Sequence, residues 1–99
     1  MVQTIRVVAH ITARSGKEAS VKSTLSGLVE PTRQEPGCIR YELLQNLNNL
    51  AEFTLLEEWE SQTALDGHTA AAHTKAAEAK MESLIEKSPP DVRFYRSLT

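Results

Sequence analysis

Four stretches of the chain alternate between hydrophobic and polar residues, the pattern of β-strands with one buried face. They span residues 4–12, 38–45, 52–59 and 92–98. Neighbouring side chains of a strand point to opposite faces, and in the first stretch one face would carry Ile5, Val7, Ala9 and Ile11. In the second stretch the same rule groups Ile39 with Tyr41 and Leu43. An asparagine-rich loop at residues 46–51 would join the second and third strands into a hairpin.

In the segment that joins the first and second strands, the spacing of apolar residues is that of a helix. Apolar residues there recur every three or four positions and form one stripe, at Val21, Leu25, Leu28 and Val29. Ser15 followed by Glu18 has the form of a capping box, so we expect the helix to begin there. Pro31 would cost about 3 kcal/mol inside a regular helix. We therefore expect a kink or an early end near Glu30.

A second helical region follows the third strand. Ser61 can cap a short helix that runs through Asp66, and Gly67 is expected to break or bend this helix. An alanine-rich helix is then predicted from Thr69 to about Glu86. Its apolar side would carry His73, Ala77, Met81 and Leu84.

The resulting order, β-α-β-β-α-β, is typical of the ferredoxin-like α+β fold, in which two main helices cover one face of an antiparallel sheet. We expect a single domain over residues 1–99. The uncovered face would still carry the apolar side chains Val8, Leu44, Leu56 and Tyr95. Such a surface usually marks a partner interface, so we predict a homodimer whose two sheets pack face to face.

Composition and charge narrow the classes of partner. Eleven Lys and Arg residues oppose thirteen Asp and Glu, and no run of like charge occurs, so we expect neither a nucleic acid nor a membrane partner. Residues 1–6 lack the pattern of a targeting peptide, and no apolar run approaches membrane-spanning length. Cys38 is the single cysteine and cannot form an internal disulfide, which agrees with a reducing compartment. We therefore expect a cytoplasmic protein.

Several short motifs, spread over nearly the whole chain, resemble one protein family. They are Glu35-Pro36-Gly37-Cys38, Tyr41-Glu42-Leu43, the segment from Glu57 to Ser61, the segment from Ala64 to His68, and Ala72-His73. Together they resemble the antibiotic biosynthesis monooxygenase domain, and most of all its small quinol monooxygenase branch. The resemblance implies a dimeric α/β barrel that oxidises a small quinol-like or polyphenolic aromatic substrate with O2, without metal, flavin or haem.

A related branch of this family degrades haem, and the chain departs from its pattern. That branch has a tryptophan before the long helix and an iron-ligating histidine on the helix. Counted from Trp59, His68 falls at the tryptophan position and Glu78 at the ligand position, so haem degradation is not expected. His68 and His73, five residues apart, would not share one face of a continuous helix. We therefore predict no metal site and no cofactor.

His68 is the first candidate for a catalytic base or anion-stabilising donor, because it follows a glycine at a helix junction and histidine titrates near neutrality. Lowering the pKa of a phenol from about 10 to about 7 requires roughly 4 kcal/mol, which one charge about 4 Å away can supply at intermediate dielectric. Glu58 could orient a histidine or accept a proton if its face lines the pocket. The alternatives are a histidine that caps its helix or bonds a backbone carbonyl, and a glutamate that is a solvated or cross-strand charge.

Five further residues are candidates for contact with the substrate. Trp59 and Tyr41 could form an aromatic wall for a flat substrate, although both can also be plain core residues. His73 would lie on the apolar side of its helix, where a buried, hydrogen-bonded histidine is the commoner case. Arg40 and His10 are candidates only if their face lines the pocket, because alternation does not show which face the helices cover.

Two other functions are compatible with the same residues. An isomerase of a small carbonyl metabolite would use His68 and Glu58 as acid and base without O2. A non-catalytic dimeric module would merely hold an apolar ligand in its cavity. Oxygen uptake distinguishes the monooxygenase from both alternatives.

Overall fold

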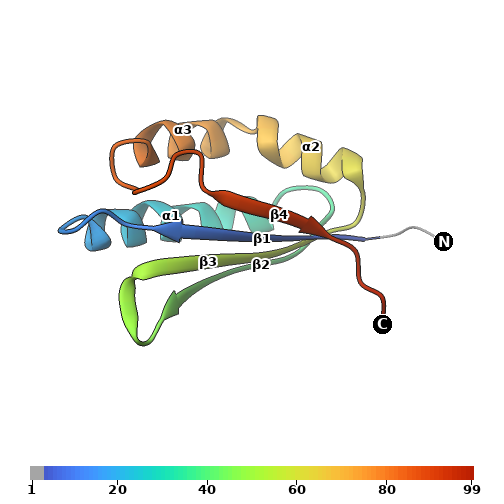
Figure 1. Ribbon diagram of the computed structural model, residues 1–99. Coiled ribbons are helices and arrows are strands. Elements are labelled where there is room, and N and C mark those ends of the chain that lie inside the picture. The colour runs from blue at the N-terminus through green and yellow to red at the C-terminus, as the bar shows by residue number, and fades with distance from the viewer. Residues whose placement is uncertain (1–3) are drawn as a thin grey trace.

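Three helices cover one face of a four-stranded antiparallel sheet in the computed structural model, which describes residues 4–99 (Figure 1). The elements are β1 (Ile5–Thr12), α1 (Glu18–Arg33), β2 (Cys38–Asn46), β3 (Asn49–Trp59), α2 (Gln62–Ala70), α3 (Ala72–Met81) and β4 (Asp91–Tyr95). The strand order is β2-β3-β1-β4. The predicted ferredoxin-like α+β fold is confirmed, with the second helical region divided in two. The prediction about a targeting peptide concerned residues 1–6, and of these residues 1–3 lie outside the described residues.

The core lies between the helices and the inner face of the sheet, which is the face that the helices cover. The strands contribute buried side chains at Val7, Ala9, Ile11, Tyr41, Phe53, Leu55 and Trp59. The helices contribute Val21, Leu25, Leu28, Leu65, Ala77 and Met81. The alternation of the first strand and the stripe of the first helix are therefore confirmed. Within residues 4–99, no helix is both long and apolar enough to cross a membrane.

One strand departs from the predicted alternation. Cys38 pairs with Trp59 and Arg40 pairs with Glu58, so Ile39 is an extra residue in the ladder. Such a β-bulge leaves its extra residue unpaired and rotates the side chain away from its expected face. Ile39 is 53% exposed, so it does not join Tyr41 in the core.

The ends of α1 also differ from the prediction. The helix begins at Glu18 with Lys17 at the N-cap position and no side-chain cap, because the chain turns at Gly16, whose φ is +83°. It then continues through Pro31 to Arg33. Proline removes only one helical N–H, and Thr32 beside it is completely buried. Tertiary packing thus holds the last turn, and both the capping box and the end near Glu30 were wrong predictions.

The break between the later helices lies at Ala71 and not at Gly67. Ser61 caps α2 as predicted, since its hydroxyl accepts a hydrogen bond from the Ala64 N–H at 3.1 Å. Ala71 has extended backbone, with ψ at 144°, and donates its N–H to the carbonyl of His68 at 3.1 Å. α3 starts directly afterwards and ends at Met81, earlier than predicted. This break changes the relation between the two histidines on either side of it.

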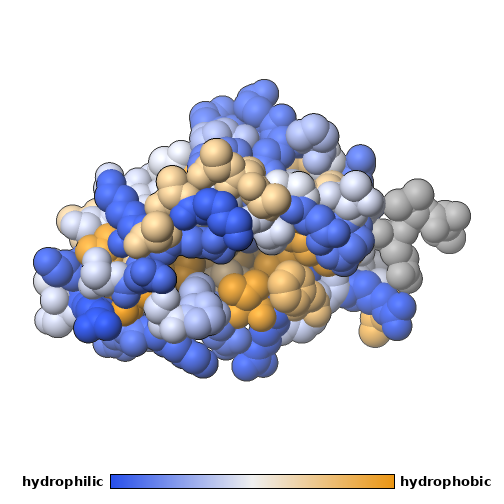
Figure 2. All heavy atoms as spheres, turned by 90° about the horizontal axis from the view of Figure 1, so that it is seen from above, coloured by the Kyte–Doolittle hydropathy of each residue, from blue (hydrophilic) through white to orange (hydrophobic). Residues whose placement is uncertain are grey.

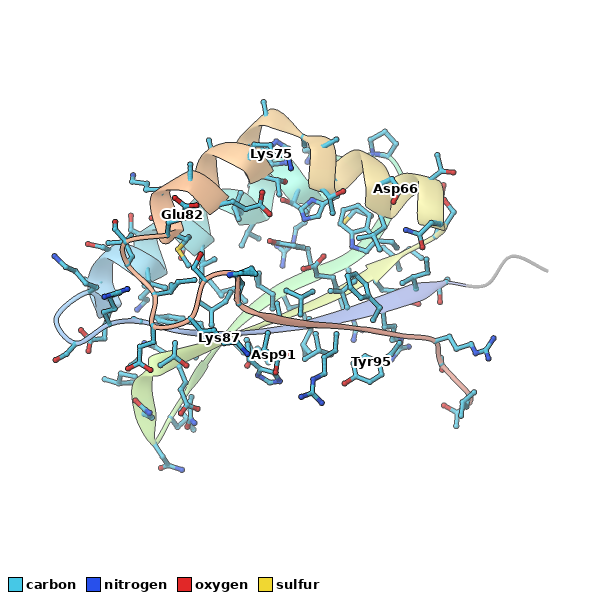
Figure 3. All side chains as sticks on the ribbon, turned by 45° about the horizontal axis from the view of Figure 1, so that its top comes forward. Asp66, Lys75, Glu82, Lys87, Asp91 and Tyr95 are labelled. Carbon is cyan, nitrogen blue, oxygen red and sulfur yellow. The ribbon has the colours of Figure 1, made fainter. Side chains whose placement is uncertain are left out.

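β4 is an edge strand that the helices leave uncovered. Its pairing with β1 puts Val92 and Phe94 on the inner face, yet these side chains are 40% and 61% exposed. Figure 2 views the helix side and shows uncovered apolar atoms in its lower middle part. Asp91 and Tyr95, labelled in Figure 3, mark the two ends of this strand, which is shorter than predicted.

Candidate active site

Two histidines and one glutamate meet between the helices and the sheet. Glu35 lies in the turn after α1, and its Oε2 is 2.9 Å from Nδ1 of His68 on α2 and 2.6 Å from Nε2 of His73 on α3. We call these three residues the histidine cluster. Their side chains are 12%, 8% and 32% exposed, respectively. His73 is therefore the outermost member, and His68 is held inside the protein.

The break at Ala71 is what allows both imidazoles to reach one carboxylate. On a continuous helix, residues five apart point about 140° away from each other. The extended residue redirects α3, so the spacing argument against two neighbouring imidazoles does not hold here. Figure 3 shows the space between these helices and the sheet filled with side chains, while Asp66 and Lys75 lie on the outer sides of α2 and α3.

Aromatic side chains from β2 and β3 pack against His68. Its ring stacks on Trp59 with 4.7 Å between the centroids, and Tyr41 meets it edge-on at 5.7 Å. Trp59 is 0% and Tyr41 2% exposed, so both are core residues that contact the histidine directly. Burial, with a smaller contribution from the Glu57 charge, raises the pKa of the Tyr41 phenol. Tyr41 therefore stays protonated and serves as a rigid neighbour.

Glu57, like Glu35, is a site residue that sequence reasoning missed. It points to the inner face, is 7% exposed, and accepts a hydrogen bond from the Trp59 indole N–H at 2.9 Å. Its Oε1 is 3.9 Å from Nε2 of His68. Burial raises the pKa of Glu57, the Trp59 hydrogen bond and His68 oppose this effect, and the Glu35 charge adds to it. A signal existed, because alternation places this carboxylate on the same face as Leu55 and Trp59.

The raised pKa of Glu57 predicts a pH-dependent stability difference between the protein and its Glu57→Gln variant. Below the ordinary value of about 4.5, Glu57 is protonated in both the folded and the unfolded chain. As the pH rises from there through the higher folded value, the unfolded chain releases this proton first, and folding loses up to about 1.4 kcal/mol per pH unit. Urea unfolding of both proteins between pH 4 and 8 measures this difference. A constant difference would contradict the prediction.

Three predicted site residues lie on the outer face of the sheet, which the helices do not cover. Glu58 forms an ion pair with Arg6 at 3.9 Å, and His10 contacts Thr54 at 3.3 Å. Arg40 pairs with a neighbouring glutamate on the same strand.

The sheet therefore separates Glu58 and His10 from the histidine cluster, whereas Arg40 lies on the edge strand β2. The carboxylate that faces His68 is Glu57 and not Glu58, because a shift of one residue along a strand reverses the face. The pairing of His68 and Glu58 that an isomerase would need as acid and base is not formed.

Two hollows adjoin residues that the sequence singled out. One of about 450 Å³ lies along β2 and is lined by Arg33, Cys38, Ile39, Arg40, Tyr41 and Glu42. The other, of about 390 Å³, includes His10, Leu44 and Thr54 of the outer face. The first volume is within the range of small-molecule sites, and Tyr41, one of the residues that line this hollow, packs edge-on against His68. Arg40 and Tyr41 thus line one hollow, and His10 lines the other.

The histidine cluster has donor atoms that could also take up a metal ion. One atom from each of Glu35, His68 and His73 lies within 4.8 Å of the others, and imidazole with carboxylate is a common ligand set for zinc. The separations of 2.6 and 2.9 Å between Glu35 and the two rings are hydrogen-bond distances. Hydrogen bonds through Oε2 of Glu35 therefore connect the three members of the cluster.

Comparison with known proteins identifies the family. The family model described as "Antibiotic biosynthesis monooxygenase" matches residues 4–80. The chain belongs to the antibiotic biosynthesis monooxygenase family. The family resemblance found in the sequence motifs is thereby confirmed, and the histidine cluster together with Trp59, Tyr41 and Glu57 falls within the matched region. By family, this protein is a candidate monooxygenase.

Relatives of this family member agree with it in length and shape. PA3566 of Pseudomonas aeruginosa superposes with a TM-score of 0.93 at 27% identity, covering 100% of this chain and 98% of that one. SO0527 of Shewanella oneidensis gives 0.91 at 30% identity, covering 98% and 93%. YcnE of Bacillus subtilis, named as a candidate monooxygenase, is 30% identical over 84 residues, which is 85% of this chain and 87% of YcnE.

Proposed function

We propose that this family member is a cofactor-independent monooxygenase that oxidises a small quinol-like or polyphenolic substrate with O2. The observation that carries the proposal is His68, a buried imidazole with one nitrogen bound to Glu35 at 2.9 Å and the other 3.9 Å from Glu57. The ring therefore has a carboxylate oxygen near each of its nitrogens, and a positioned imidazole is the most common general base in enzymes. Family membership supports oxygen chemistry in particular.

The proposed reaction starts with transfer of a substrate hydroxyl proton to the imidazole. The resulting anion is electron-rich enough to pass one electron to O2, and the superoxide and substrate radical combine at a ring carbon. The intermediate then loses water, for which His68 returns the proton. If RH2 stands for the substrate with the two hydrogen atoms that it loses, the overall reaction is RH2 + O2 → RO + H2O. The substrate itself supplies both electrons that reduce the second oxygen atom to water.

The packing around His68 favours this chemistry. Trp59 and Tyr41 shield one side of the ring from water, and charges in a dry environment interact more strongly than in solvent. The hollow along β2, lined in part by Tyr41 and Arg40, is our candidate for the substrate position. A flat aromatic molecule there would contact Tyr41, whose ring meets that of His68 edge-on.

Oxygen consumption tests the proposal. An oxygen electrode should record uptake with chemically reduced menadione at a rate well above that of the protein-free blank. With 18O2, mass spectrometry should find one labelled oxygen atom in the product and the other in water. Uptake at the rate of the blank with a panel of naphthoquinols and polyphenols would contradict the proposed function and favour the non-catalytic binding module.

We further propose that the protein is a homodimer in which two outer sheet faces pack together. Leu44 and Tyr95 are 45% and 48% exposed on this face, and Val8 and Leu56 between them are half-buried. Exposed apolar groups that line up on one sheet face are costly in water and are typical of interfaces. A dimer would bury them and convert the two sheets into a closed α/β barrel.

Sedimentation of a charged variant provides the test. Leu44→Asp should sediment as a monomer at micromolar concentration, because a carboxylate would have to be buried in the interface. Leu47→Asp is the matched control, since Leu47 lies at the tip of the hairpin and is 94% exposed; it should remain a dimer like the unmodified protein. A monomeric mass for the unmodified chain would exclude the proposed assembly.

A further inference from the structure

We propose that Glu35 is a positioning residue that holds His68 as the Nδ1–H tautomer, and that His73 keeps Glu35 in place by donating a hydrogen bond to it. The inference rests on the proposed function, because it concerns the histidine that would take the substrate proton. It assigns roles to a glutamate that sequence reasoning did not select and to a histidine that it placed in substrate contact.

The direction of the hydrogen bonds follows from the chemistry of the acceptor. An ionised carboxylate can only accept, so both rings must present an N–H to Oε2 of Glu35. His68 then carries its proton on Nδ1, at 2.9 Å, and His73 carries one on Nε2, at 2.6 Å. The lone pair of His68 is consequently on Nε2, the nitrogen that faces Glu57 at 3.9 Å.

This tautomer matters because only the nitrogen with the lone pair can act as a base. A carboxylate bonded to the opposite nitrogen fixes the tautomer and the ring orientation, and it stabilises the imidazolium that forms. Glu35 occupies that position relative to His68. Its separation of 33 residues from His68 along the chain shows that this contact depends on the packing of α2 against the turn after α1.

His73 has a different position from His68 and therefore a different role. Its side chain is 32% exposed, whereas that of Glu35 is 12% exposed, so the imidazole lies between the carboxylate and solvent. Without it, water could reach Glu35 and compete for the oxygen that binds His68. A hydrogen bond from a neutral donor is sufficient for this role, and transfer of a proton is not required.

The role of His73 as a donor predicts which substitutions preserve the rate of oxygen uptake. His73→Gln keeps an N–H that can reach Glu35, and kcat should stay within about threefold of the unmodified protein. His73→Ala removes the donor, and kcat should fall at least about tenfold with KM unchanged. Lys75→Ala, at an exposed position of the same helix, is the control. Loss of kcat in the glutamine variant equal to that in the alanine variant would overturn this role.

Substitution of Glu35 tests the tautomer itself. In Glu35→Gln the amide can donate to Nδ1 of His68 and so favour the wrong tautomer, and kcat should fall about 100-fold with KM little changed. The matched control is Glu78→Gln on the exposed side of α3, which should be unaffected. An equal kcat for the two glutamine variants would contradict the positioning role.

Nitrogen NMR separates this inference from the proposed function, because it needs no turnover. In protein labelled with 15N-histidine, His68 should carry its proton on Nδ1, and Glu35→Gln should move it to Nε2. This pattern supports the positioning role even if no quinol is oxidised, and an unchanged tautomer in the variant overturns it even if quinols are oxidised. Calorimetric binding of one Zn2+ per chain that is lost in His73→Ala would also overturn it, because the cluster would then be a metal site.

Discussion

Replacement of His68 by glutamine is expected to lower the rate of oxygen uptake with reduced menadione by about 100-fold or more. A positioned general base typically contributes a factor of about 10² to 10⁴, and an amide cannot accept the substrate proton. Glutamine is close in size to histidine and can still bond Glu35, so the stack on Trp59 should be disturbed little. The measurement is kcat at saturating quinol, together with the thermal unfolding midpoint of each protein.

The control for this variant is Lys75→Ala, on the outer side of α3 (Figure 3), which should retain the full rate. If His68→Gln folds normally and its rate lies within twofold of the unmodified protein, His68 is not the base. In that case family membership and fold would stand, and the proton acceptor would have to be sought elsewhere.

Replacement of Trp59 should cause the largest loss of stability. Its side chain is completely buried, and Trp→Ala substitutions in cores typically cost about 3–5 kcal/mol. Single domains are stable by only about 5–15 kcal/mol, so Trp59→Ala should bring this chain close to unfolding. Urea denaturation at one fixed protein concentration measures the loss. A cost below about 1 kcal/mol would show that Trp59 does not anchor the core.

The milder variant Trp59→Phe isolates the hydrogen bond to Glu57. The ring remains, but the indole N–H that Glu57 accepts at 2.9 Å is lost, which should cost about 1–3 kcal/mol because a buried acceptor is left without its donor. The cost should be smaller in a Glu57→Gln background, and the double-mutant cycle measures that coupling. Leu47→Ala, at an exposed position of the hairpin, is the control.

Local patterns predicted most of the architecture. The alternation of β1, the apolar stripe of α1 and the cap at Ser61 were all predicted correctly. The burial of one face of an element and the hydrogen bonding of the free N–H groups at a helix start both depend on residues near each other in sequence. The errors fell where distant contacts override local preference. α1 continues past Pro31 because Thr32 is packed into the core, and Ile39 is left exposed at a bulge in the pairing of β2 with β3.

The candidate site was only partly predictable for the same reason. His68, Trp59 and Tyr41 were selected from the sequence and do lie together. Glu58 was selected in place of Glu57, because alternation defines two faces of a strand without showing which one the helices cover.

The sequence by itself determined the order of the helices and strands and the protein family. It also placed His68 shortly after the strand that ends in Trp59. Each of these conclusions depends on residue types at short spacing along the chain. Only the tertiary structure decided that Glu35 joins His68 and His73, across 33 and 38 residues of chain. That contact exists because Ala71 interrupts the helix and because α2 packs over the turn after α1. Neither feature can be recognised from the periodicity of hydrophobic residues along the chain.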